Sequence, residues 1–253
     1  MLLLISPAKS FDFESPANTL SSSEPDFIQE STRLIKKMNT FSRKKLGKLM
    51  SISPELAALN VDRYQKWTPK PKRENTKQAL LAFNGEVYRG LNAKEMSEQD
   101  LEFAQNHLRI LSGLYGVLRP LDQIQPYRLE MGTKLKYYGY NNLYQFWGDK
   151  ITKRLNEDMG ESNFIINLAS TEYYKSVNES KLKGKVITPI FKDFSNGTYK
   201  VLMTYAKTAR GVMANYIIKN RITDPELMKS FDGKGYAYDP SKSDEINWVF
   251  TRG

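Results

Sequence analysis

The chain has 253 residues, a formal net charge of +10 and a hydrophobic content of 40%. It contains no cysteine and one histidine, His107, which excludes disulfides, thiolate chemistry and Cys/His sites for zinc or iron–sulfur clusters, so we predict no cofactor. The apolar N-terminus is only about six residues long, against the roughly 20 that a membrane span needs, so we expect a cytoplasmic protein without a membrane partner.

The chain begins with a predicted strand and a predicted helix. Residues 2–6 (LLLIS) predict a buried strand, because the four residues before Ser6 are all apolar. Residues 21–38 predict a helix with Ser23 as its N-cap, because apolar residues recur at helical spacing from Phe27 to Met38.

A helix pair follows at about residues 42–67. Ser42 and Ser53 are predicted N-caps, and Pro54 occupies the first position of the second helix. Two short helices joined by about three residues form a helix-hairpin-helix, and the start of the second offers backbone N–H groups to a phosphate. Glu55, however, places a negative charge where a phosphate would approach. The alternative interpretation is a helix hairpin that only packs against the rest of the protein and binds no phosphate. The residues predicted to bind phosphate in this motif are Arg43, Lys44, Lys45, Lys48 and Ser53.

The net charge is concentrated in residues 33–77. This segment holds 13 basic and three acidic residues, whereas the remaining residues hold 25 of each. A concentrated basic surface most often binds phosphates, so DNA is the predicted partner.

The rest of the chain alternates between predicted strands and helices. Asn196-Gly197 marks an antiparallel hairpin. The predicted strands are 79–83, 109–111, 164–168, 185–194, 198–205 and two short ones in 235–252, and the predicted helices are 97–108 with a capping box, 143–159 and 209–222. This order predicts the α+β class, with one mixed sheet flanked by helices in a single domain, residues 1–253.

Several predicted strands end in a small or polar residue. If these strands are parallel neighbours, their ends meet at one edge of the sheet, where ligands of open sheets bind. Lys9, Asn84, Ser112 and Ser170 are therefore expected in one cleft.

Residues 108–132 combine arginine, tyrosine, glycine and proline. Arginine is suited to bidentate contact with phosphate, so this stretch is a candidate wall of the cleft; alternatively, its arginines pair with Asp122 and Glu130 and only fix a loop. The residues predicted to contact an anion are Lys9, Arg109, Tyr115, Arg119, Arg128, Lys207 and Arg210. Those predicted to support them are Ser6, Asn84, Ser112, Asp122, Glu130 and Ser170.

Six motifs occur in an order that resembles the bacterial YaaA family of peroxide stress resistance proteins. They are SPAK, FNGEVYRGL, LSGLYGVLRPLDQIQPYRLEMG, LYQFWGD, NLAS with EYYKSV, and KTARG. The resemblance implies a family-specific fold with a positively charged cleft and a helix-hairpin-helix. It also implies binding to duplex and structured DNA in the response to hydrogen peroxide, including protection from free iron.

Two functions remain open from the sequence. One is binding of DNA with little sequence preference. The other is an enzyme acting on a nucleotide, a nucleobase or damaged DNA in the same cleft, with a small nucleotide as its ligand. Iron binding is disfavoured, because the chain has one histidine and no cysteine.

Overall fold

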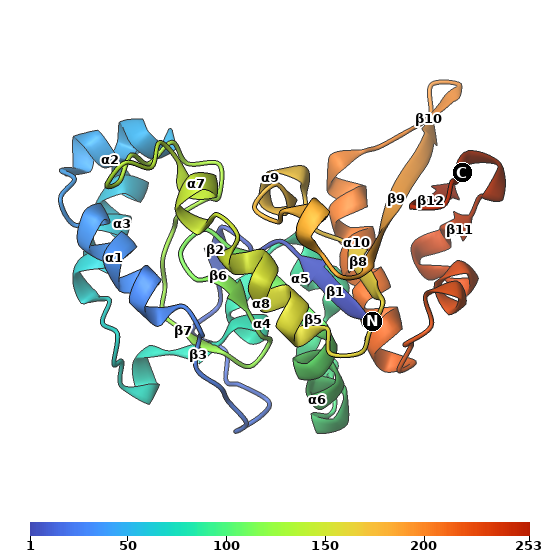
Figure 1. Cartoon of the computed structure of the whole chain (residues 1–253), viewed down its shortest axis with the longest axis horizontal. Helices are drawn as coiled ribbons and strands as arrows, with labels where there is room; N and C mark the ends of the chain where they lie inside the picture. Colours follow the sequence, from blue (N-terminus) through green and yellow to red (C-terminus); the bar gives the residue numbers. More distant parts are fainter.

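The computed structural model describes residues 1–253 and contains one large sheet with helices around it (Figure 1). The sheet has eight strands in the order β11-β12-β9-β8-β1-β5-β6, and β10 pairs with β9. The strands are β1 (Leu2–Ile5), β5 (Leu108–Ser112), β6 (Gly116–Leu118), β8 (Phe164–Asn167), β9 (Lys185–Ser195), β10 (Thr198–Lys200), β11 (Ala237–Tyr238) and β12 (Asn247–Arg252).

The central strands β12, β9, β8, β1 and β5 are parallel to one another, whereas β6, β10 and β11 are antiparallel to their neighbours. The predicted α+β class with a mixed sheet is thus confirmed. Parallel strands point their carboxyl ends the same way, so the segments after β1, β8 and β9 all leave the sheet at one edge. We call it the carboxyl edge.

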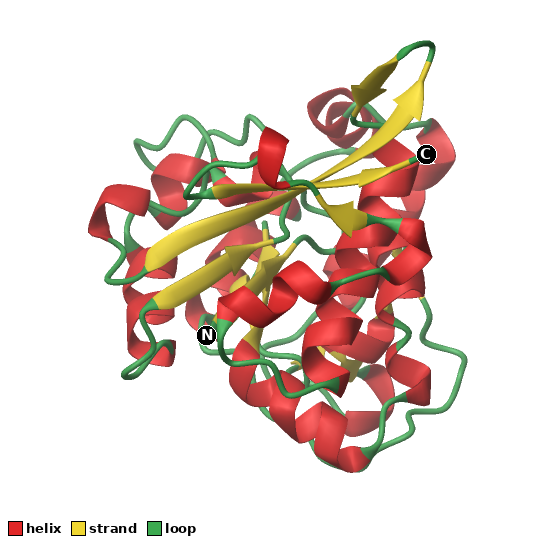
Figure 2. Ribbon diagram, turned by 90° about the vertical axis from the view of Figure 1, so that its right-hand side faces the viewer, coloured by secondary structure: helices red, strands yellow, loops and turns green.

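Helices cover both sides of the fan of strands in Figure 2. They are α1 (Ile28–Met38), α2 (Arg43–Met50), α3 (Pro54–Lys66), α4 (Ala79–Ala82), α5 (Glu86–Leu91), α6 (Glu98–His107), α7 (Leu143–Trp147), α8 (Lys150–Asp158), α9 (Thr171–Tyr174) and α10 (Met203–Lys219). Helices α1, α2, α3 and α7 form a group at the left of Figure 1. None of the helices has both the length and the apolar character needed to cross a membrane.

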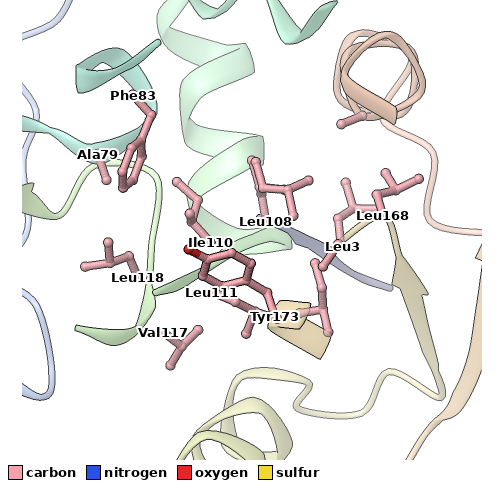
Figure 3. Packing of buried hydrophobic residues seen from close by; sticks show 14 of the residues in the cluster. Leu3, Ala79, Phe83, Leu108, Ile110, Leu111, Val117, Leu118, Leu168 and Tyr173 are labelled. Atoms are coloured by element: carbon pink, nitrogen blue, oxygen red, sulfur yellow. The ribbon is translucent and has the colours of Figure 1, made fainter. Parts of the chain in front are cut away.

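A cluster of 62 buried hydrophobic residues fills the interior and includes residues from Met1 to Phe250. All four residues of β1 and all five of β5 are buried, as expected for parallel strands covered on both faces. Figure 3 shows Leu3, Leu108 and Ile110 side by side within this core.

Three of the predicted helix N-caps are confirmed by hydrogen bonds between their side chains and the first turn of the helix. Ser42 Oγ accepts from the amide of Lys45, and Ser53 Oγ accepts from the amide of Leu56. Ser97 and Asp100 form the predicted capping box of α6.

Ser23 is a wrong prediction, because α1 begins five residues later at Ile28. Its hydroxyl instead donates to Asp122 at 2.6 Å, and its backbone forms a bridge with the same segment. Ser23 therefore forms its side-chain hydrogen bond with a residue far along the chain and not with an amide at the start of α1.

Three other element predictions are corrected. Residues 79–82 form the helical turn α4 and only Phe83 lies in a strand, because the amides of Ala79 and Leu80 donate to carbonyls of Asp122 and Pro120. The helix predicted at 143–159 is split into α7 and α8 at Gly148, whose φ is +49°. The second hairpin strand ends at Lys200, and α10 begins six residues before the predicted start.

Helices α5 and α10 cross at two glycines. A Cβ atom on Gly211 would lie 1.9 Å from the carbonyl oxygen of Val87, and one on Gly90 would lie 2.3 Å from that of Thr208. We expect Gly211→Ala to destabilise the protein by roughly 1–3 kcal/mol, because the helices must separate. Urea denaturation measures this, and Gly160→Ala, at a site with open space but a φ of +54°, controls for backbone strain alone. Equal losses in the two variants would contradict the packing explanation.

Candidate functional site

The carboxyl edge is held together by two serines that follow adjacent strands. Ser6, after β1, accepts from the amide of Ser170 at 2.9 Å and donates to its hydroxyl at 3.2 Å. Tyr88 of α5 donates to the carbonyl of Ser6 at 3.1 Å. These bonds join the loops after β1 and β8 to α5.

Two further segments that were predicted to contribute to the cleft, the turn after Asn84 and the start of α10, also lie at the carboxyl edge. Asn84 pairs with Ser10 in a small antiparallel ladder, which consists of β2 (Ser10–Phe11) and β4 (Phe83–Asn84). A Cβ on Gly85 would lie 3.1 Å from that of Ala8. Thr208 of α10 donates to Glu86 at 3.2 Å. The structure therefore brings the loop with Lys9, the turn after Asn84 and the start of α10 side by side.

Glu130 is clamped between two cations. Lys9 Nζ lies 2.7 Å from one carboxylate oxygen, and the Arg128 guanidinium lies 3.0 Å from the other. The pairing of Arg128 with Glu130 is the loop-fixing alternative that the sequence left open. One carboxylate between two cations still leaves one unbalanced positive charge.

Arg63 of α3 is a cation of this site that sequence reasoning missed. Its guanidinium lies 5.6 Å from the centre of the Phe11 ring, and its only hydrogen bond is to the side chain of Asn60. Burial lowers the pKa of Arg63, and the neighbouring charge of Arg128 lowers it further. No carboxylate pairs with it, so the site has two positive charges in excess.

Helix α3 is anchored directly to the stretch that forms the other wall of the site. Tyr64 donates to the carbonyl of Arg128, and Trp67 Nε1 donates to Tyr115 Oη at 2.9 Å. These bonds fix the position of α3 relative to Arg128 and Tyr115.

Tyr115 and Ser112 lie beneath this surface rather than on it. Tyr115 is fully buried, and burial raises its pKa to about 12. Ser112 shares a 2.7 Å hydrogen bond with Tyr127. Both residues support the site, and neither is exposed to a ligand.

Two predicted anion-binding arginines and one supporting carboxylate have structural partners elsewhere. Arg109 forms a buried ion pair with Asp158 at 2.6 Å, and the two side chains are 5% and 7% exposed. Arg119 lies 3.1 Å from Asp122 and donates to the carbonyl of Glu24. Burial raises the pKa of Asp122, against the effect of its bonds to Ser23 and Arg119. The structure does not bring these three residues to the carboxyl edge.

The two cations at the start of α10 have no ion-pair partner. Lys207 is exposed, whereas Arg210 is half-buried. Burial lowers the pKa of Arg210, and no carboxylate opposes this effect. Helical spacing places Arg210 on the same face as the buried Ala206 and Met213, so its side chain leaves the helix toward the protein rather than away from it.

The cations of α2 are fully available to solvent. Arg43, Lys44, Lys45 and Lys48 are exposed, and none forms an ion pair. The start of α3 is less available than the sequence suggested, because Ser53 occupies the amide of Leu56. Hydrogen bonding to the backbone also lowers the pKa of Glu55, which favours a negative charge at this helix start.

The recess between Lys9, Tyr127, Glu130 and Tyr173 has a volume of about 10 Å³, which is the space of one water molecule. A separate, larger pocket of about 290 Å³ is lined by residues that include Asp12, Asn84, Tyr88, Arg89 and Lys94. No group of three or more histidine or carboxylate side chains is placed to hold a metal ion.

Comparison with known proteins gives consistent matches along the whole chain. The family model described as peroxide stress protein YaaA matches residues 1–242. A UPF0246 protein of Ralstonia pickettii is 52% identical over 100% of this chain and 99% of its own length. UPF0246 proteins of Teredinibacter turnerae and of a Janthinobacterium species are each 51% identical over 100% of this chain and 99% and 98% of their own lengths.

Proposed function

Because the chain belongs to the YaaA family of peroxide stress proteins, we propose that it acts in the bacterial peroxide response by binding DNA. The observation that supports this most is the excess of positive charge at the site: Arg63 and the cations of α2 have no ion-pair partner, and Lys9 and Arg128 share the single carboxylate of Glu130. Cations without carboxylate partners are free to neutralise phosphates, and the duplex backbone supplies phosphates at regular spacing.

The proposed contacts are to the DNA backbone and not to base edges. Lysine provides most of the exposed charge on α2, and it binds phosphate as a point charge. Arg63 and Arg128 add planar donors at the wall of the site. Such contacts give little sequence preference, because phosphates are the same in every sequence.

The helix pair α2/α3 is proposed to act as a helix-hairpin-helix. Its three-residue connection and close helix contact fit this role: a Cβ on Gly47 would lie 3.7 Å from that of Ala57. Since Ser53 already occupies the amide of Leu56 and Glu55 places a negative charge at the start of α3, the lysines of α2 supply most of the attraction for phosphate.

An enzyme acting on a nucleotide is the weaker alternative. The recess at Glu130 holds about 10 Å³, and a nucleobase needs many times that space. An exposed basic surface, by contrast, needs no enclosed pocket. The volume therefore favours binding over catalysis in this recess.

The salt dependence of duplex binding tests the proposal. Seven cations of the site and of α2 lack ion pairs, namely Arg43, Lys44, Lys45, Lys48, Arg63, Lys207 and Arg210. If all seven meet phosphates, log K falls against log salt with a slope of about −6. Fluorescence anisotropy with two duplexes of unrelated sequence should give the same slope and similar affinities. An affinity that hardly changes between roughly 50 and 200 mM salt would exclude backbone binding by this surface.

A further inference from the structure

Tyr205, in the first turn of α10, ends a stack of planar groups that begins in the core. The Arg252 guanidinium lies 4.8 Å from the centre of the Tyr205 ring and 4.6 Å from that of the buried Tyr236. Asp193 fixes both inner layers, because it accepts from Arg252 Nε at 2.7 Å and from Tyr236 Oη at 2.8 Å. The fixed Arg252 guanidinium therefore supports the outer ring, and Tyr205 is 51% exposed.

The surroundings of Tyr205 combine positive charge with exposed apolar surface. Lys200 lies opposite Asp193 in the ladder, on the same face as Arg252, and the carbonyl of Lys234 accepts from Arg252. Lys200, Lys207 and Lys234 form no ion pair, and Asp193 is already occupied. Met203 is 60% exposed. An exposed ring among unpaired lysines is the arrangement by which proteins bind unpaired nucleic-acid strands.

The position of this surface relates it to the DNA surface proposed above. Strand β9 is parallel to β8 and, through it, to β1, so the β9–β10 hairpin and the start of α10 extend from the carboxyl edge. The hairpin projects at the top of Figure 1. Thr208, three residues after Tyr205, is bonded to Glu86 beside the loop that bears Lys9.

We propose that Tyr205 is a stacking platform for an unpaired base of DNA, with Lys200, Lys207 and Lys234 holding the adjacent phosphates. This inference rests on the proposed DNA binding and adds a substrate preference to it. A base has a flat π surface that continues the Tyr236, Arg252 and Tyr205 stack, and its phosphates match the lysines. A second copy of this chain would bring the same positive charges against them, so the charge favours nucleic acid.

The test compares an intact duplex with one of equal length that contains a three-nucleotide single-stranded gap, with 2-aminopurine in the gap. The wild-type protein should bind the gapped DNA roughly 5- to 100-fold more tightly and quench the 2-aminopurine fluorescence. Tyr205→Ala should lose both the preference and the quenching while binding the intact duplex as before, and Tyr205→Phe should retain both. Tyr138→Ala removes a tyrosine that is 87% exposed elsewhere and is the matched control.

The outcomes separate the two proposals. If the protein binds neither DNA, the proposed function fails and this inference fails with it. If it binds both DNAs equally, or if Tyr205→Ala quenches like the wild type, the platform is refuted while DNA binding stands. Circular dichroism and thermal melting of the Tyr205 variants check that each is folded, and Tyr205→Phe gives a second result if the alanine variant is not.

Discussion

Replacing Arg109 by methionine is expected to lower the free energy of unfolding by about 3–5 kcal/mol, a factor of roughly 150 to 5,000 in the folding equilibrium. The guanidinium is buried and makes three contacts: with Asp158 at 2.6 Å, and with the carbonyls of Gln105 and Leu108 at 2.9 and 2.7 Å. Methionine fills the same space but leaves these buried acceptors without their donor. Urea denaturation followed by tryptophan fluorescence measures the loss.

Arg128→Met is the informative control, because Arg128 is also partly buried but lies in the proposed binding surface. Its partner Glu130 keeps the ion pair with Lys9, so stability should fall by only about 1 kcal/mol. Duplex affinity should fall in this variant and stay unchanged in folded Arg109→Met. A stable Arg109→Met protein that binds DNA weakly would show instead that Arg109 belongs to the binding surface.

Replacing Lys44, Lys45 and Lys48 of α2 by glutamine is expected to weaken duplex binding roughly 10- to 100-fold at physiological salt. Each lysine that meets a phosphate releases a counterion, so the slope of log K against log salt should become less steep by up to about 2.7. The three side chains are exposed and unpaired, so stability should not change. Anisotropy titrations at several salt concentrations measure both quantities.

The matched control removes three exposed lysines from another part of the surface, Lys153, Lys183 and Lys185. Strand β9 begins at Lys185, so two of them lie at the edge opposite to the carboxyl edge. This variant has the same net charge as the α2 variant. If both variants lose the same affinity, DNA responds to overall charge and α2 has no special role.

The elements that the sequence predicted well are those fixed by neighbours in the chain. The caps at Ser42, Ser53 and Ser97 each bond to an amide three residues later, so a local pattern determines them. Ser23 and residues 79–83 were predicted wrongly because their partners lie in residues 120–122, far along the chain. Local propensity cannot anticipate a bond whose partner is placed by the tertiary fold.

In the site, too, some positions could be predicted from the local sequence, whereas others depend on contacts between distant parts of the chain. The apolar runs predicted β1 and β8 as strands, and the parallel pairing that the predicted cleft required as a condition places Ser6 and Ser170 together. Arg109 lies at the second residue of β5, at the opposite end from the carboxyl edge, a position that counting along the strand could have revealed. Arg63 could not be assigned, because only the docking of α3 on Arg128 brings it to the site.

The bonds of Tyr64 and Trp67 have a further consequence for the proposed binding of DNA. They are complete in the free protein, so α3, with α2 packed against it at Gly47 and Ala57, would meet DNA already in place and would not have to fold on contact. The entropy loss that accompanies the ordering of a disordered basic arm is therefore absent. The distance between the cations of α2 and those of the carboxyl edge is fixed, and a duplex that reaches both must itself supply any bending.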